Sequence, residues 1–356
     1  MSERVADYRF AESVRLRISG PERALRHFDA EYGEVAVPPG SAGEPDVEVC
    51  IGFGLRVQPI AGGATVTGGH KTARWKVALG PADTHPLQAS IVLAGGPPSF
   101  ALSLVQGYFL EALVGVALAD QGGVALPSAG FVAGEGVTVV LGRSGAGKTT
   151  LTARALAGGR TVLSDDQVVV DATGRVWRYP RRLRLYPDIR HTAPDAWSRL
   201  PAGTRSALEL RGRVRRLTRG YVAPSLAVPV SGIGKTVTPG PLPLRRIVVV
   251  ERAPVEEPTV ATLPADWVVE EAGLVLADQR DRLSRAVGGT WTERLDAALE
   301  VERRTVAAAL TGVPATQVIL PRTWAAPRAV DALEAHLGIT PGSATRPEEP
   351  LDHPTR

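Results

Sequence analysis

Apolar and polar residues alternate in short runs between Ser13 and Leu93, which is the pattern of half-buried β-strands. The runs are Val14–Ile18, Asp46–Ile51, Ala64–Val66, Trp75–Leu79 and Ala89–Leu93. A helical pattern over Pro21–Phe28 interrupts them, and the stretch Gly95-Gly96-Pro97-Pro98 ends the series. The sequence therefore predicts a small, mainly β N-terminal domain over residues 1–97.

A longer apolar stretch follows and predicts a helix from about Phe100 to Asp120. Its length is close to that of a membrane span. Gln106, Gly107 and Glu111 interrupt it, however, and Pro and Gly residues flank it. We therefore expect a helix buried in a globular core and no membrane association.

The next pattern is a short β-branched run, a glycine-rich loop and a helix. Val137–Leu141 is typical of a buried strand, and Thr150–Leu156 contains no Gly or Pro before Gly158. Thr161–Leu163 predicts a second strand, and Leu244–Glu251 predicts a third. The C-terminal third has helical periodicity.

Two helices are marked by their ends. We expect one to begin with a capping box at Thr290 and Glu293, and another to run from Pro327 to a stop at Gly338.

The loop between the first strand and the helix carries the clearest chemical signal. It reads Gly-Arg-Ser-Gly-Ala-Gly-Lys-Thr and fits G-x-x-x-x-G-K-[ST] at every fixed position. In such a phosphate-binding loop the backbone N–H groups surround the phosphates, the lysine reaches the β- and γ-phosphates, and the hydroxyl binds Mg²⁺. The candidate nucleotide-binding residues are Gly142, Arg143, Ser144, Gly145, Ala146, Gly147, Lys148, Thr149 and Thr150.

Two carboxylates, Asp165 and Asp166, follow the second predicted strand, and Asp165 lies seventeen residues after Lys148. Phosphoryl transfer to a hydroxyl needs a base near the attacking oxygen, and a divalent ion needs oxygen ligands. The two carboxylates are therefore candidates for a catalytic base and a Mg²⁺ ligand, beside Lys148 as a catalytic residue and Thr149 as a Mg²⁺ ligand.

This arrangement resembles the kinase domain of the HPr kinase/phosphorylase family, whose fold is similar to the core of phosphoenolpyruvate carboxykinase. The resemblance is carried by the glycine-rich loop, the Gly158–Arg160 turn and the run Val-Leu-Ser-Asp-Asp ending at Asp166. It covers residues 131–170 well and residues 171–277 thinly. It implies an α/β fold with a P-loop kinase domain over residues 98–339. The periodicity already described predicts the helical C-terminal region of this domain, and the Pro, Gly, Ser and charged residues of the tail predict disorder over 340–356.

By the same resemblance, Asp165 matches the carboxylate that accepts the proton of the acceptor serine, and Asp166 matches a carboxylate near the metal. The implied function is an ATP- and Mg²⁺-dependent kinase that phosphorylates a hydroxyl, with serine in a protein or peptide as the favoured acceptor. A small-molecule kinase and a homo-oligomer stay open. Lys148 and Mg²⁺ are expected to keep Asp165 ionised.

Two departures from the family pattern define the alternative. Members of the family carry a histidine before the loop, where this chain has Leu126–Gly130, and their Arg-Gly-Leu-Gly segment is replaced here by Arg178–Arg190. The second hypothesis is therefore a non-catalytic, nucleotide-dependent binding or regulatory protein.

Composition predicts the cellular compartment and shows an uneven distribution of charge along the chain. A single cysteine, Cys50, excludes an internal disulfide, and no apolar segment follows the charged start Met1–Tyr8, so we expect a cytoplasmic protein. Thirteen arginines and three acidic residues fall within residues 175–219. This segment is either a surface for an acidic or phosphate-bearing partner or a solvated face. No nucleic-acid-binding motif accompanies it, which disfavours nucleic acid.

Two further features carry weaker signals. Ser231–Thr236 resembles a second phosphate-binding loop, but Pro229 stands where the pattern requires glycine, so an exposed loop around Lys235 is the better interpretation. Glu251, at the end of a predicted strand, is a weak candidate for supporting a metal site.

Overall fold

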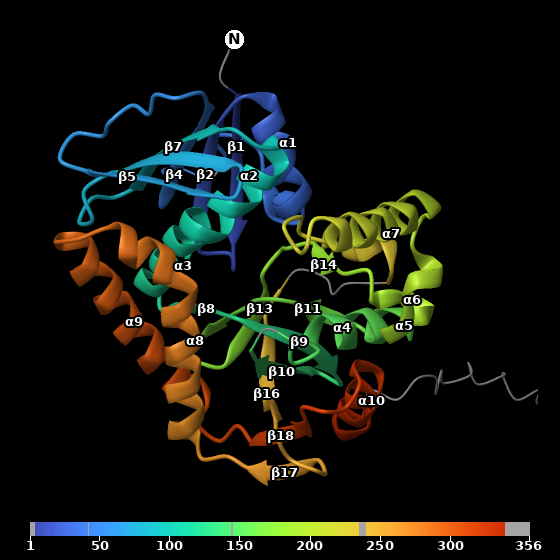
Figure 1. Ribbon diagram of the computed structural model, residues 1–356. Coiled ribbons are helices and arrows are strands. Elements are labelled where there is room, and N and C mark those ends of the chain that lie inside the picture. The colour runs from blue at the N-terminus through green and yellow to red at the C-terminus, as the bar shows by residue number, and fades with distance from the viewer. Residues whose placement is uncertain (1–3, 42, 144, 235–239, 339–356) are drawn as a thin grey trace, which may run out of the picture.

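The computed structural model describes residues 4–41, 43–143, 145–234 and 240–338. Within these ranges the chain is a mixed α/β protein with a mainly β N-terminal region and a helical C-terminal region (Figure 1). The predictions for Ser144, for Lys235 and for the tail from residue 340 lie outside the described residues.

The N-terminal region is one twisted sheet with the strand order β3-β1-β2-β4-β7-β6-β5. The strands are β1 (Arg4–Phe10), β2 (Val14–Gly20), β3 (Ala36–Val37), β4 (Val47–Phe53), β5 (Ala64–His70), β6 (Ala73–Leu79) and β7 (Leu87–Ala94). Alternate residues are buried along β2, β4 and β7, because one face packs on helices while the other meets solvent. The buried face is covered by α1 (Glu22–Tyr32) and α2 (Pro98–Val105). The alternation in the sequence thus gave the strand pattern correctly, except for β1 and β3.

The predicted long helix runs from Pro98 to Asp120 as α2, a π-helical turn (Gln106–Leu110) and α3 (Glu111–Asp120). It is long and apolar enough to cross a membrane, yet 78% of its most apolar window is buried inside the protein. All but the last residue of α3 are buried. Its apolar surface is therefore used in the core, as predicted.

The second sheet contains β10 and β16, which are parallel neighbours, and β18, which lies parallel to β16. Its main strand order is β11-β9-β10-β16-β13-β12-β8. In addition, β18 pairs with residues 247–253 of β16, and β17 pairs with β18. The strands are β8 (Gly123–Leu126), β9 (Ser128–Ala133), β10 (Gly136–Gly142), β11 (Val162–Ser164), β12 (Val168–Asp171), β13 (Arg175–Arg178), β16 (Leu242–Ala253), β17 (Thr259–Thr262) and β18 (Ala315–Pro321). A separate pair joins β14 (Leu183–Leu185) to β15 (Leu226–Val228).

Helices cover both faces of this second sheet (Figure 1). One face carries α4 (Lys148–Ala157), α5 (Ile189–Thr192), α6 (Pro194–Arg199) and α10 (Ala326–Leu337). The other carries α3, α8 (Ala265–Ala286) and α9 (Thr290–Ala309). The remaining helix, α7 (Ala202–Leu217), buries only Leu208 and projects beside the sheet. The buried parts of β10 and β16, at Val137–Leu141 and Ile247–Val250, are consequently mostly apolar.

One cluster of buried side chains joins the two sheets through α3. It runs from the N-terminal strands through the Pro98–Asp120 helix to Val169, Trp177 and Trp291. The indole N–H of Trp291 donates to the Gly80 carbonyl at 2.9 Å, and the Phe10 and Tyr179 rings lie 5.1 Å apart. The N-terminal sheet is therefore packed directly against the rest of the molecule.

The C-terminal helices differ in detail from the prediction. α9 begins at Thr290, but its N-cap is Gly289 with φ +58°, and no side-chain cap is formed, so the predicted capping box is wrong. A glycine reaches that backbone conformation without strain, which removes the need for a side-chain cap. α10 ends before Gly338 at φ +67°, as predicted. Between them, β18 returns to the sheet, which the helical prediction missed.

Candidate active site

The glycine-rich loop (residues 142–149) leaves the end of β10 and enters α4, as the sequence predicts. Gly145 and Gly147 have φ +86° and +103°, values that suit glycine, and Gly147 is the N-cap of α4. The Ala146 N–H donates to the Arg143 carbonyl at 3.1 Å, which closes the turn. The loop therefore sits at a helix N-terminus, where an anion is stabilised.

Two glycines hold the loop close to its neighbours. A Cβ on Gly142 would stand 2.8 Å from the Val250 carbonyl oxygen of β16, so a larger residue would push the two strands apart. A Cβ on Gly147 would lie 3.4 Å from Val330 of α10. Packing against β16 and α10 thus restricts the path of the loop.

Helix α4 is anchored at its far end. The Arg154 guanidinium pairs with Asp331 at 2.5 Å and Glu334 at 2.9 Å, both on α10, and donates to the Thr192 carbonyl at 2.5 Å. The helix ends at Gly158, followed by Gly159 with φ +77°. These contacts fix the direction in which the N-terminus of α4 points.

Lys148 is half-buried and folds back over the loop. Its ammonium donates to the Gly142 carbonyl and lies 3.5 Å from the Arg143 carbonyl. Burial lowers the pKa of Lys148, whereas Asp166 and Asp165 act in the opposite direction. The cation is thus held between the loop carbonyls and the two carboxylates.

Asp165 lies directly after β11 and reaches the loop. The Thr149 hydroxyl donates to Asp165 Oδ2 at 3.1 Å. The other oxygen, Oδ1, is buried, although the residue as a whole is partly exposed, and it has no hydrogen-bond partner among the described residues. The nearby Thr152 hydroxyl is likewise buried without a bond of normal geometry. A carboxylate with one unsatisfied oxygen is well suited to a cation or a proton.

The environment of Asp165 raises its pKa to about 6. Burial is the main cause and the Asp166 charge adds to it, while the hydroxyls of Thr152 and Thr149 and the Lys148 ammonium oppose the rise. Burial thus outweighs the Lys148 ammonium by itself, and the expectation that Lys148 and Mg²⁺ together keep Asp165 ionised stays a prediction.

Asp166 points to a different partner. Its carboxylate is half-exposed and forms an ion pair with Arg181, whose side chain is 13% exposed. Arg181 also contacts Glu111 of α3 at 3.3 Å. Thr149, the other candidate metal ligand, bonds Asp165 instead of Asp166. The structure thus brings Lys148, Thr149, Asp165 and Asp166 together in one cleft, where Arg181, which the sequence analysis did not single out, pairs with Asp166.

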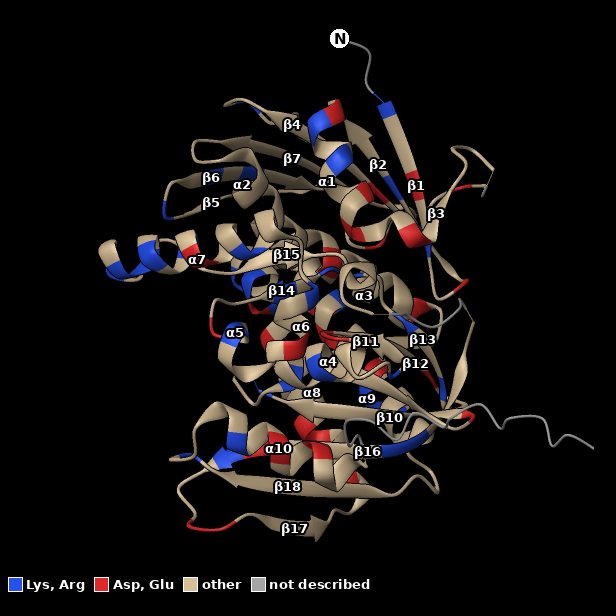
Figure 2. Cartoon of the chain, turned by 90° about the vertical axis from the view of Figure 1, so that its right-hand side faces the viewer, with Lys and Arg blue, Asp and Glu red and all other residues tan. Residues whose placement is uncertain are grey.

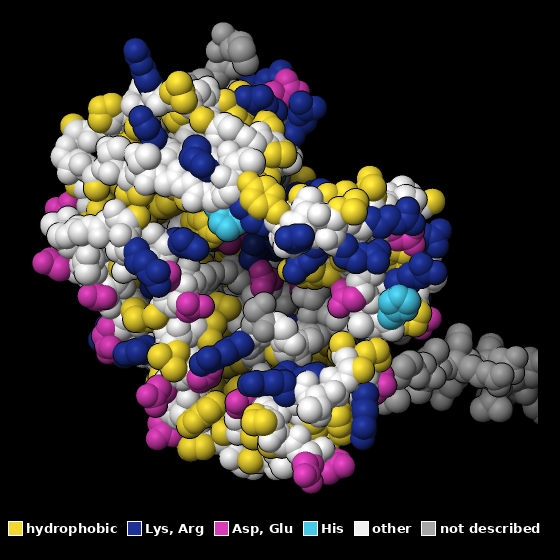
Figure 3. Space-filling view, in the orientation of Figure 1, with side chains coloured by type: hydrophobic (Ala, Val, Ile, Leu, Met, Phe, Trp, Pro, Cys, Tyr) yellow, Lys and Arg dark blue, Asp and Glu magenta, His cyan; other side chains and the backbone are white. Residues whose placement is uncertain are grey.

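These residues lie in a large cleft of about 1490 Å³ at the carboxyl ends of β10, β11 and β16. Its walls include the loop, both aspartates, Pro127, α5 and one side of α7. Figure 3 shows the hollow at the centre of this face, between the N-terminal region and the α7 arm. Ligands of α/β sheets commonly bind at such strand ends.

Part of the arginine-rich segment (residues 175–219) forms ion pairs within the protein. Three of its arginines pair with acidic residues of α1, of the turn that follows it, and of α3, and these pairs connect the second half of the chain to the first. These pairs are Arg178–Glu34, Arg181–Glu111 and Arg182–Glu31. These three arginines thus form ion pairs within the protein, a use that neither sequence-based interpretation of the segment included. Burial alone would raise the Glu31 pKa, but Arg182 and Arg184 bring it below its usual value.

One weaker candidate, Glu251, is not in the cleft. Glu251 is exposed on β16 and accepts a hydrogen bond from the Gln317 amide at 3.1 Å, so it does not support a metal site there. The segment before the loop carries no histidine, and Ser128 N donates to the Asp166 carbonyl at 2.9 Å. The cleft does contain His191 of α5.

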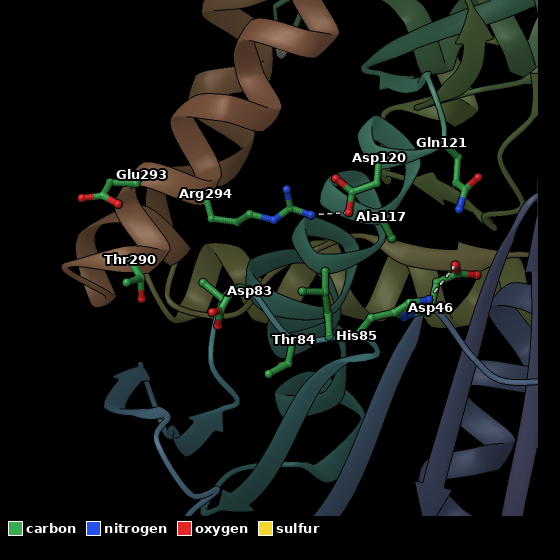
Figure 4. Close-up of a pocket in the computed structure, with 12 residues that line it drawn as sticks. Asp46, Asp83, Thr84, His85, Ala117, Asp120, Gln121, Thr290, Glu293 and Arg294 are labelled. Carbon is green, nitrogen blue, oxygen red and sulfur yellow. Dashed lines mark hydrogen bonds and ion pairs between the residues drawn. The ribbon is translucent and has the colours of Figure 1, made fainter.

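A smaller cavity of about 460 Å³ lies far along the chain from the loop, between the β6–β7 connection and the start of α9 (Figure 4). Two of its carboxylates have partners: Asp120 pairs with Arg294, and Asp46 accepts the Arg15 backbone N–H at 2.7 Å. No group of three metal-ligating side chains occurs there or elsewhere in the described ranges. The larger cleft is therefore the candidate active site.

Comparison with known proteins gives no family: no family model matches the chain, and no curated protein matches it.

Proposed function

We propose that this protein is a kinase that binds ATP with Mg²⁺ in the cleft and transfers the γ-phosphoryl group to a hydroxyl. The observation that carries the proposal is the meeting of Lys148, Thr149 and Asp165 at the N-terminus of α4, beside parallel strand ends. It agrees with a P-loop kinase fold of the HPr kinase type. Serine in a protein or peptide is the proposed acceptor, and the cytoplasm the proposed compartment.

The oxygens present fit Mg²⁺. Asp165 Oδ1 is buried without a partner, the Thr149 hydroxyl lies 3.1 Å from Asp165 Oδ2, and Asp166 offers a further carboxylate. Mg²⁺ takes one or two carboxylates and completes its shell with water and phosphate oxygens. We propose that Thr149 and Asp166 hold the ion, which when bound neutralises charge on the phosphates.

The chain's own residues then have distinct tasks. The loop N–H groups and the α4 N-terminus orient the phosphates. Lys148 leaves the Gly142 carbonyl and stabilises the charge that develops on the transferred group. Asp165 accepts the proton of the attacking hydroxyl. Its pKa of about 6 suits that role, because at neutral pH it is mostly ionised and still basic enough to take a proton.

Two observations favour a second function. The carboxylates have no histidine beside them in the segment before the loop, and Arg181 already holds Asp166. Both features suit a protein that binds nucleotide and signals its presence without transferring phosphate. A small-molecule kinase differs from the first proposal only in its acceptor.

The experiment is to measure ATP binding and γ-phosphate release, to water or to an acceptor, in the wild type and in Asp165→Asn. Loss of the base should leave ATP binding intact and lower transfer by roughly 10²–10⁴-fold. Asp188→Asn is the control, since Asp188 lines the same cleft away from the loop. Full transfer by Asp165→Asn would place the base elsewhere. ATP binding without any transfer in the wild type would favour the regulatory protein.

A further inference from the structure

One side of α7 faces the cleft with a regular spacing. Glu209, Gly212, Arg213 and Arg216 all line it, at positions i, i+3, i+4 and i+7 of one helix. With a rise of about 1.5 Å per residue, this face extends roughly 10 Å along the cleft. Figure 2 shows the basic residues distributed along α7. The C-terminal part of this face, from Arg213 to Arg216, therefore presents positive charge to the interior of the cleft.

The orientation of α7 is fixed by close packing. A Cβ on Gly212 would stand 3.2 Å from the Pro187 ring, so glycine permits the helix to lie directly against the segment before α5. The Arg211 guanidinium, on the next side of the helix, donates to the Ser225 carbonyl at 2.5 Å. These contacts with neighbouring segments therefore fix which side of α7 faces the cleft.

The arginines of this face have no partners of their own. Arg213, Arg215 and Arg216 are exposed, and the described part of the chain offers their side chains no hydrogen bond or ion pair. Arg184 of β14, half-buried in the cleft wall, likewise forms no hydrogen bond or ion pair in the described part of the chain, although its charge acts on Glu31. Glu209 does not neutralise them, because it pairs with Arg190 at 3.2 Å. This contrasts with the three arginines that are paired to α1, its following turn and α3.

The cleft is larger than one small ligand requires. Small-molecule pockets measure about 300–1,000 Å³. The cleft measures about 1490 Å³, and the loop occupies only one end of it. Space thus remains beside the phosphates for a second molecule that contacts the α7 face.

We infer that the cleft arm formed by Arg184, Arg213, Arg215 and Arg216 docks an acidic segment of a polypeptide and brings its hydroxyl to Asp165. This inference rests on the proposed kinase function and names its acceptor. The arginines of α7 span about 4.5 Å of helix axis from Arg213 to Arg216, which matches one to two residues of an extended chain. The exposed apolar side chains of Tyr186 and Leu274 in the same walls suit a polypeptide. The carboxylates of Asp188 and Glu209 disfavour a uniformly anionic nucleic acid strand.

The test uses a fluorescent serine peptide rich in glutamate, its glutamine counterpart and a labelled single-stranded oligonucleotide. Their binding is measured by anisotropy at low and high salt, together with Mg-ATP affinity by calorimetry. We expect the acidic peptide to bind best. Arg184→Gln/Arg213→Gln/Arg216→Gln should weaken it by about tenfold, as the loss of three modest charge contacts would. Its Mg-ATP affinity and melting temperature should stay near those of the wild type.

Two controls make the result specific. The triple variant Arg26→Gln/Arg205→Gln/Arg304→Gln removes the same charge at sites outside the cleft and should bind the peptide like the wild type. Lys148→Ala should lose Mg-ATP and keep the peptide. A protein that binds the peptide but no nucleotide would thus contradict the kinase function and leave the docking surface standing.

Several results would overturn the inference. One is the absence of peptide binding by the wild type, and another is an equal loss in the two arginine variants. A third is an oligonucleotide that binds more tightly than the peptide and depends on the cleft arginines. The last is a loss of Mg-ATP affinity in the cleft variant as large as in Lys148→Ala, which would assign these arginines to the nucleotide.

Discussion

The properties of Asp165 arise from its position between a strand end and a helix N-terminus. One of its oxygens receives the Thr149 hydroxyl, and the other is buried without a partner among the described residues. Burying a carboxylate disfavours its charged form, which is why its pKa rises to about 6. The same feature that makes it a good base therefore costs stability at neutral pH.

That cost can be measured. The folded protein holds the Asp165 proton up to about pH 6, whereas the unfolded chain releases it near 3.8. The cost therefore grows as pH rises from about 4 to about 6 and is complete above that. Asp165→Asn should be more stable than the wild type by about 2 kcal/mol at neutral pH, since one pKa unit is worth about 1.4 kcal/mol and the buried amide loses part of the gain.

Urea unfolding of both proteins without nucleotide, from about pH 4 to 8, tests this prediction. The advantage of Asp165→Asn should shrink steadily as pH falls below about 6. A pH-independent difference, or a variant that is less stable at neutral pH, would contradict the environment described for Asp165.

The sequence predicted the residues of the site better than their partners. Gly142, Gly147, Lys148 and the two aspartates follow from a local pattern, because loop and strand ends are set by neighbouring residues. Arg181 is different, since it meets Asp166 only after β13 and the following segment fold back beside α3. Such contacts depend on tertiary structure and leave no local signal in the sequence.

At the scale of elements, Arg181 connects the segment after β13 to α3. It contacts Glu111, which also accepts hydrogen bonds from the Tyr32 hydroxyl at 3.1 Å and the Gln106 amide at 2.9 Å. Burial opposes the charge of Arg181, but Glu111 and Asp166 raise its pKa well above the usual value. The buried carboxylate therefore depends on this one guanidinium for its counter-charge.

Arg181→Met should destabilise the protein by about 3 kcal/mol, because it leaves Glu111 buried without a cation. Adding Glu111→Gln should recover most of the loss, since the amide oxygen still accepts a hydrogen bond and carries no charge. Chemical unfolding of the two single variants and the double variant gives the coupling. Additive losses, or a single variant within about 0.5 kcal/mol of the wild type, would refute the link.

The predictability of elements followed their periodicity. The alternating strands, the strand–loop–helix unit and α10 were predicted from regular patterns. Helix α7 was not, because only Leu208 of its residues is buried and arginines obscure the apolar stripe. β1 was missed because it mixes charged and apolar residues near the N-terminus, and its partner β2 decides which face is buried.

At the scale of the whole molecule, the N-terminal region is joined by ion pairs to a segment beside the cleft. Acidic residues of α1 and of the turn after it form ion pairs with two arginines, and an acidic residue of α3 pairs with a third. The three arginines lie between the end of β13 and the start of β14. The Lys71 ammonium also donates to the Tyr221 carbonyl beyond α7. The sequence indicated a boundary near residue 97, but the shared core and these ion pairs arise from contacts between distant segments that no local pattern encodes.

The central claim is that the cleft binds Mg-ATP through the glycine-rich loop. Calorimetric titration of Mg-ATP into the wild type, Lys148→Ala and Lys76→Ala tests it most directly. Lys76 is exposed on β6, outside the cleft, and controls for the loss of one lysine charge. We predict binding to the wild type and to Lys76→Ala, and a loss of at least about tenfold in Lys148→Ala, because its ammonium offsets the phosphate charge. Equal affinity in all three proteins, or no binding to the wild type, would contradict the account.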